Sequence, residues 1–153
     1  MKQVNYTLLA EQIRSLAESS SAVIPVLANA SALLGDAMEG VNWAGFYLVS
    51  EGALIVGPFQ GKPACVRIEK GRGVCGTAWK EDKVQVVPDV HEFPGHIACD
   101  AASRSEIVIP LHHGGEIVGV LDIDRPVTGR FTPEDEEGLV RFAGTLEDII
   151  SWD

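Results

Sequence analysis

The residues of this chain that could carry covalent chemistry are gathered in one segment. All three cysteines, Cys65, Cys75 and Cys99, fall between positions 65 and 99, and two of the four histidines, His91 and His96, lie among them. A thiolate is a strong nucleophile, and a second thiol can reset its oxidised form. The spacing therefore indicates either a redox site built from thiols or three small apolar side chains that are simply buried.

Two further sets of residues could complete such a site. Asp122 and Asp124 are two apart in a run that reads as a strand, so their side chains share a face, and Glu106 lies at the start of the preceding run. Like charges on one face raise the pKa of one carboxyl, which suits a proton donor. Trp43 and Tyr47, four apart in another predicted strand, also share a face and could wall a pocket.

Each of these residues also has a plain structural explanation. Two carboxylates on one face of a strand are common on a solvated sheet surface, and Trp43 and Tyr47 would more often belong to a core. The cysteines stand too far apart for the CxxC pairs of a structural zinc site, so we expect neither metal nor cofactor. His112 and His113 are expected to form a turn together with Gly114 and Gly115.

The chain is predicted to begin with two helices and to end with a third. Apolar residues at helical spacing predict one helix from Tyr6 to Ala17 and another from Val23 to Leu34, which Gly35 would end. Thr132 and Pro133 then have the types expected at the cap and first position of a last, amphipathic helix.

Between these helices the chain has the character of strands and turns. GRGVCGTAW reads as a loop that enters a short helix, and residues 89–104 read as a long ordered loop, a kind that is usually functional. Turn residues join the first two and the last two strands into hairpins, which indicates an α+β fold with an antiparallel sheet. The predicted strands are 42–49, 53–56, 64–68, 84–87, 106–110 and 117–123.

Composition narrows the class of protein. The 153 residues are predicted to form a single domain, 1–153, and 46% of them are hydrophobic, enough for a full core. A net charge of −10 argues against nucleic acid and anionic membranes as partners. We see neither a signal peptide nor an apolar run of the roughly 18 residues that a membrane span needs. The odd number of cysteines then favours a cytoplasmic protein with reduced thiols.

Five segments carry a resemblance to a known family. They are, in order, NWAGFYL, GPFQGKPAC, GRGVCGTAW, VVPDVHEFPGHIACDAASRSEIVIPL and GVLDIDRP. They resemble the free methionine-(R)-sulfoxide reductases, which use a GAF-type domain. The resemblance implies a six-stranded antiparallel sheet flanked by helices, often in a homodimer, and reduction of free methionine sulfoxide by cysteine thiols. The alternative is a GAF-type sensor that binds a small molecule without catalysis.

The resemblance also implies a role for each thiol. Cys99 would be the catalytic nucleophile that becomes a sulfenic acid, and Cys65 the resolving thiol. Cys75 would be a further recycling thiol, and thioredoxin the reductant. A disulfide between Cys65 and Cys99 is therefore expected in the oxidised protein.

The carboxyl and aromatic residues receive roles in the same way. Glu106, Asp122 and Asp124 would bind the ammonium group of the substrate and supply the proton that the departing oxygen needs, with Asp124 the first choice of donor. Trp43 and Tyr47 would line the pocket around the methyl group. The resemblance implies no metal and no cofactor.

Overall fold

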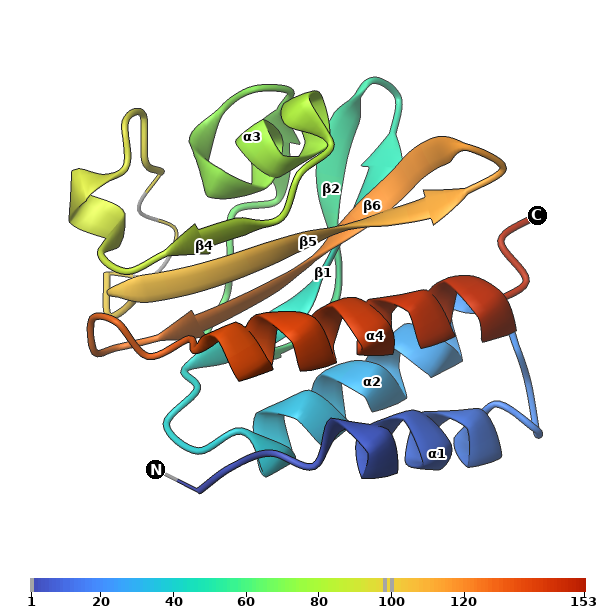
Figure 1. Cartoon of the computed structure of the whole chain (residues 1–153). Coiled ribbons are helices and arrows are strands. Elements are labelled where there is room, and N and C mark those ends of the chain that lie inside the picture. Colours follow the sequence, from blue (N-terminus) through green and yellow to red (C-terminus); the bar gives the residue numbers. More distant parts are fainter. Residues whose placement is uncertain (1, 98, 100) are drawn as a thin grey trace.

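The computed structural model describes residues 2–97, 99 and 101–153, which form one sheet with helices on both faces (Figure 1). Two helices precede the first hairpin, and the longest helix follows the last strand. Over the described residues the elements are, in chain order, α1 Tyr6–Leu16, α2 Val23–Ala37, β1 Trp43–Ser50, β2 Ala53–Gly61, β3 Arg67–Glu69, α3 Gly73–Glu81, β4 Gln85–Val87, a 3-10 turn Val90–Glu92, β5 Ser105–His113, β6 Glu116–Arg125 and α4 Pro133–Ile149.

The strands form an antiparallel sheet in the order β3-β2-β1-β6-β5-β4. The two predicted hairpins are β1–β2 and β5–β6, and the pairing of β1 with β6 joins them at the centre. The register places Trp43 opposite Asp124, and Asp124 opposite Glu106. Three candidate site residues therefore stand in a row across the sheet. The expected α+β fold with a six-stranded antiparallel sheet is confirmed.

The two faces of the sheet are covered by different elements. α2 and α4 lie against one face with α1 packed on their outer side, whereas α3 and the loop before β5 lie over the other face (Figure 1). Along β6, Leu121 and Ile123 join the apolar core beneath the three helices. Asp122 and Asp124 point to the α3 face. The alternation of side chains along a strand thus separates the core from the candidate site.

The second helix ends later than we predict from its glycine. α2 continues through Gly35 to Ala37, because Leu34 and Met38 are both fully buried and the apolar stripe outlasts the glycine. The burial of Met38 outweighs the low helix propensity of Gly35, which is less favourable than alanine by only about 1 kcal/mol.

The second strand is also longer than predicted, and the third is displaced. β2 extends to Gly61 instead of ending at Val56. Its register with β1 slips along this stretch, and the resulting bulge accommodates Pro58, which has no N–H to donate to a ladder. The expected strand 64–68 is instead β3, which pairs with the first residues of β2.

The turn expected over residues 112–115 is shorter than predicted. The histidine part of the prediction is wrong, because His112 and His113 belong to β5. The turn consists of Gly114 and Gly115, which both have positive φ. This is the backbone that a two-residue hairpin requires and that glycine adopts at little cost. The histidines therefore pair with β6, and His113 stands opposite Glu116.

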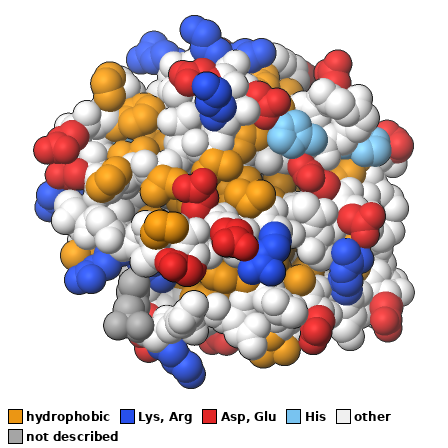
Figure 2. All heavy atoms as spheres, viewed as in Figure 1, with side chains coloured by type: hydrophobic (Ala, Val, Ile, Leu, Met, Phe, Trp, Pro, Cys, Tyr) orange, Lys and Arg blue, Asp and Glu red, His pale blue; other side chains and the backbone are white. Residues whose placement is uncertain are grey.

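The last helix begins at the residues that we predict. Thr132 and Asp135 form a reciprocal capping box, and Pro133 occupies the first turn of α4. Acidic, basic and apolar side chains are interspersed over the face in view (Figure 2). Among the helices that the structure describes, we find none with the length and apolar character to cross a bilayer.

Candidate active site

A pocket opens on the α3 face of the sheet and encloses about 40 Å³, enough for two or three water-sized groups. Seven of the eight residues predicted for the site line it, and the eighth, Cys65, is bonded to one of them. The lining residues are Trp43, Tyr47, Ala64, Ile68, Arg72, Gly73, Val74, Cys75, His96, Ile97, Cys99, Ser103, Glu106, Asp122 and Asp124.

Three buried carboxyl groups form the floor of this pocket. Glu106 on β5 is 7% exposed, and Asp122 and Asp124 on β6 are 5% and 8% exposed. Burial raises the pKa of Glu106 well above its usual value, and the charges of Asp122 and Asp124 raise it further. Burial also raises the pKa of Asp122, although hydrogen bonds with Glu106 and the Cys75 thiol oppose this. The cluster therefore favours a protonated carboxyl at Glu106.

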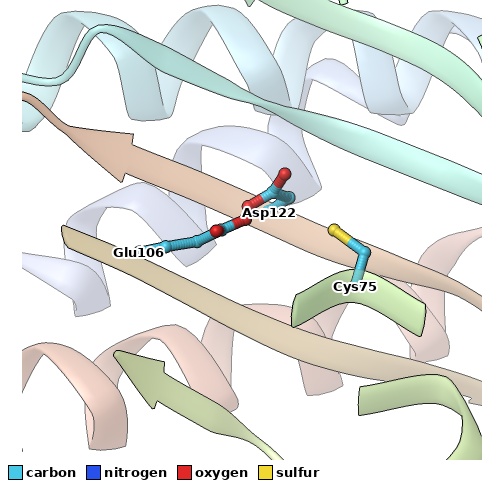
Figure 3. Close-up of side chains that lie close together, drawn as sticks. All are labelled: Cys75, Glu106 and Asp122. Atoms are coloured by element: carbon cyan, nitrogen blue, oxygen red, sulfur yellow. The ribbon is translucent and has the colours of Figure 1, made fainter. Parts of the chain in front are cut away.

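The first turn of α3 presents Cys75 to the carboxyl groups. The helix packs so closely on β3 that a Cβ on Gly76 would lie 2.6 Å from the carbonyl oxygen of Glu69, so only glycine fits there. The Cys75 Sγ and one carboxylate oxygen each from Glu106 and Asp122 lie within 4.8 Å of one another (Figure 3). Burial, and then the adjacent carboxylates, raise the pKa of the Cys75 thiol well above its usual value. Cys75 is thus a neutral, buried thiol.

The other two cysteines are joined across the rim of the pocket. Cys65, between β2 and β3, and Cys99, in the loop before β5, form a disulfide with Cα atoms 5.3 Å apart. This is the pairing that the resemblance implies, and it is confirmed. The bond connects two loops that are far apart in sequence, while Cys99 itself faces the same pocket as the carboxyl groups.

Two aromatic side chains form the wall beside β1. The rings of Trp43 and Tyr47 stack with centroids 5.8 Å apart, and the ring of Phe59 also stacks on Trp43 at 5.0 Å. The indole N–H of Trp43 donates to the carbonyl of Lys62 at 3.2 Å, which fixes the ring. Burial raises the pKa of Tyr47 far above its usual value, and the nearby carboxylates add to the shift. The wall is therefore rigid, largely apolar and neutral.

The family of this chain follows from its likeness to known proteins. The GAF domain family matches residues 6–150. The free methionine-R-sulfoxide reductase of Escherichia coli (strain K12) is 53% identical over 146 residues, which are 95% of this chain and 88% of that protein. The chain belongs to the GAF-domain family of free methionine-R-sulfoxide reductases.

Solved structures of this reductase family share the fold almost completely. The fRMsr of Staphylococcus aureus in complex with substrate is 51% identical and superposes with a TM-score of 0.92 over 99% of both chains. The free methionine-R-sulfoxide reductase of Neisseria meningitidis in complex with its substrate is 43% identical, with a TM-score of 0.89 over 94% of this chain and 86% of that one. The likeness therefore covers every element that builds the pocket.

The reductase pocket also has walls formed by residues to which we assigned no site role from the sequence. Arg72, just before α3, and Ser103, just before β5, bring a cation and a hydroxyl to it. His96 and Ile97 close the side near Cys99, and burial, together with the neighbouring His91, lowers the pKa of His96. Arg72 lies in GRGVCGTAW and the others in the long segment that contains Cys99, so the resemblance was the signal that could have found them.

Proposed function

We propose that this chain reduces free L-methionine-(R)-sulfoxide to L-methionine, with its cysteines as the source of electrons. The observation that carries this function is the Cys65–Cys99 disulfide at the rim of a pocket floored by buried carboxyl groups. A disulfide beside a protonated acid is the expected product of a thiol that has reduced a sulfoxide. A bond that served only to stabilise two loops would have no use for the buried acid.

The chemistry divides into three balanced steps. In the first, the Cys99 thiolate attacks the sulfoxide sulfur while a carboxyl protonates the oxygen. The resulting hydroxyl group passes from the substrate sulfur to Cys99 Sγ as the transient sulfur–sulfur bond breaks, so methionine leaves and Cys99 becomes a sulfenic acid. In the second, the Cys65 thiol displaces water from this sulfenic acid and forms the disulfide. In the third, an external dithiol reduces the disulfide and is itself oxidised.

The pocket suits a free amino acid. The substrate's ammonium group is paired with the carboxyl floor, where Glu106, Asp122 and Asp124 are all buried. Burial of an ammonium group is costly unless carboxylates compensate for the lost water, so this floor selects for the charge. Trp43 and Tyr47 would contact the methyl group, and Arg72 is placed to meet the substrate carboxylate.

Two neighbouring carboxyls can serve as the acid. Asp124 is the donor that we expect from its pairing with Asp122, and it lies directly across the sheet from Glu106. Glu106 has the raised pKa and is hydrogen-bonded to Asp124. We propose that Glu106 holds the proton in the resting enzyme and that the donor is either Glu106 itself or Asp124 through this hydrogen bond.

The remaining roles concern recycling and assembly. Cys65 is the resolving thiol in our proposal, and Cys75, buried and neutral, is at most a reserve recycling thiol. Thioredoxin is the reductant that such a disulfide requires in a reducing cytoplasm. A homodimer is supported by exposed apolar side chains on α1 and α2, namely Leu8, Leu16 and Ile24, and light scattering of the purified protein tests it.

One assay separates the enzyme from a GAF-type sensor. The reduced protein is incubated with each epimer of free methionine sulfoxide, without external reductant, and methionine is counted per chain. We expect one methionine per chain from the R epimer and little from the S epimer. A peptide-like control, N-acetyl-methionine sulfoxide amide, should react far more slowly because it lacks the ammonium group. Binding without any methionine formed would favour the sensor.

A further inference from the structure

The group formed by Cys75, Glu106 and Asp122 has an arrangement that the thiol cycle leaves unused. One ligand atom of each residue, a sulfur and two carboxylate oxygens, lies within 4.8 Å of the others. They come from three elements, α3, β5 and β6, and their side chains converge in the close-up (Figure 3). In the proposed cycle the electrons pass through Cys99 and Cys65, so Cys75 has no necessary part.

One atom of this group lacks a partner. Among the described residues, none forms a hydrogen bond to Oδ1 of Asp122, although the residue is only 5% exposed and faces the pocket. A buried carboxylate oxygen without a partner is costly, and nearby cations are attracted to it. The substrate ammonium is one such cation, and a metal ion is another.

The donor set selects among metal ions. Mg²⁺ and Ca²⁺ prefer six or more oxygen ligands, which one thiol and two carboxyls do not supply. Zn²⁺ accepts a mixture of cysteine sulfur and carboxylate oxygen in a four-coordinate shell, at distances of about 2.0–2.3 Å. Three protein ligands leave a fourth position for water, and a cavity of about 40 Å³ has room for the ion and that water.

We propose that this reductase binds one Zn²⁺ reversibly through Cys75, Glu106 and Asp122, and that the ion inhibits it by occupying the place of the substrate ammonium group. Binding of the ion is independent of the proposed function, whereas inhibition rests on it. The Cys75 thiol and the carboxyl groups must lose their protons to bind Zn²⁺. Zinc binding should therefore release protons and depend on pH. Cysteine spacing alone cannot reveal such a site, because two of its ligands are carboxylates on a hairpin.

The oxidised wild-type protein gives the sharpest test, because its disulfide leaves Cys75 as the one thiol in the sequence. Calorimetry with Zn²⁺ should show one ion per chain, and Cd²⁺ should produce the ultraviolet charge-transfer band of a metal thiolate. Cys75→Ala should abolish the band. Cys75→Ala and Glu106→Gln should each lower the affinity for zinc, and by more than the roughly 10–100-fold that is typical when a residue that only supports a ligand is lost. The matched control is His91→Gln/His96→Gln, which removes the histidine that lines the pocket and its neighbour and should bind zinc normally.

Competition tests the second half of the proposal. L-Methionine should displace Cd²⁺ from the oxidised protein, as read from loss of the band, whereas glycine, which chelates metal through the same amino-acid groups, should be much less effective. Zinc binding that survives Cys75→Ala, or wild-type protein that shows no thiolate band, overturns the site. Displacement by glycine and methionine alike overturns the overlap with the ammonium position. A protein that binds zinc as described but never forms methionine refutes the function and leaves the site standing.

Discussion

The two faces of the sheet use neighbouring residues of the same strand for opposite purposes. On the helix face, Leu121 and Ile123 are fully buried among apolar side chains of α1, α2 and α4. On the α3 face, their neighbours Asp122 and Asp124 are almost as deeply buried but ionisable. Burial of apolar surface stabilises the fold, whereas burial of carboxyl groups opposes it. The apolar burial on the helix face therefore helps to offset the cost of the ionisable groups that are buried on the other face.

The largest expected effect is a loss of activity on the α3 face, in variants that remain folded. Cys99→Ser should abolish even a single turnover, because a serine hydroxyl is not ionised and forms no sulfenic acid. Cys65→Ser should retain the first turnover and lose most steady-state activity with thioredoxin. Single-turnover product, measured per chain, distinguishes the two variants. Stoichiometric methionine from Cys99→Ser would show that another cysteine is the nucleophile.

Carboxyl variants on the same face should lose catalytic rate while they keep their free energy of unfolding. Glu106→Gln and Asp124→Asn keep the shape of the side chain but cannot deliver a proton, and loss of a positioned acid typically slows the chemical step about 10²–10⁴-fold. Their free energies of unfolding should be unchanged or higher, because each removes a buried ionisable group. Urea unfolding and single-turnover rates provide the two measurements. If Asp124→Asn alone retains its rate, Glu106 is the direct donor; equal loss of stability and rate in both would contradict the division between the faces.

The helix face should show the reverse behaviour. Leu146 on α4 is fully buried in the core and distant from the pocket residues in sequence and layer. Leu146→Ala should lower the free energy of unfolding by about 2–5 kcal/mol, through lost apolar burial and the remaining cavity. The rate per folded molecule should stay near that of wild type below the unfolding transition. A variant that remains folded but loses its rate would mean that the helix core also shapes the pocket.

A small, pH-dependent effect is expected at the edge shared by both faces. His112 lies between Asp82, at the end of α3, and Glu147 on α4, with ring nitrogens 2.6 and 3.0 Å from their carboxylates. Burial alone would lower the pKa of His112, but these hydrogen bonds and charges outweigh it, so the pKa is raised. The charged form stabilises the fold fully below the unfolded-state pKa of about 6.5, and this contribution disappears as pH rises through the raised value.

The measurement is the free energy of unfolding of wild type and His112→Asn from acid to alkaline pH. Because the ring is partly exposed, the difference should not exceed about 1 kcal/mol, and it should shrink as pH rises. His113→Asn is the matched control, since its partner Asp153 is almost entirely exposed. A difference that grows with pH, or an equal effect at His113, would contradict the role of the Asp82–His112–Glu147 bridge.

The site was predictable from sequence wherever a local rule decided the outcome. Strand alternation correctly predicted that Asp122 and Asp124 share a face, and the paired runs correctly predicted both hairpins. The link between Cys65 and Cys99 depended on the family resemblance, because 34 residues separate them and no local pattern joins them. The approach of Cys75 to Glu106 was not predictable, because it depends on how α3 packs on the sheet.

Three boundaries that we predicted wrongly depend on packing or on turn geometry. Gly35 did not end α2 because Met38 is buried beyond it, and Pro58 did not end β2 because a bulge accommodates it. The turn expected over residues 112–115 is confined to Gly114 and Gly115, which tolerate positive φ, and both histidines extend β5. At the first two boundaries tertiary packing or a bulge outweighed the propensity of a single residue, whereas at the third the preference of glycine for positive φ set the turn.

The Cys65–Cys99 bond also links the redox state of the protein to its stability. In each proposed cycle the bond forms and is then reduced, and while it is present it lowers the entropy of the unfolded chain. Closing a loop of 34 residues restricts the denatured ensemble, which on the chain-entropy account raises the free energy of unfolding by about 3–4 kcal/mol. The oxidised enzyme should therefore melt at a higher temperature and resist proteolysis longer than the reduced one. The form that awaits its reductant is then the more durable of the two, and a thermal melt can report the redox state of the protein in a mixture.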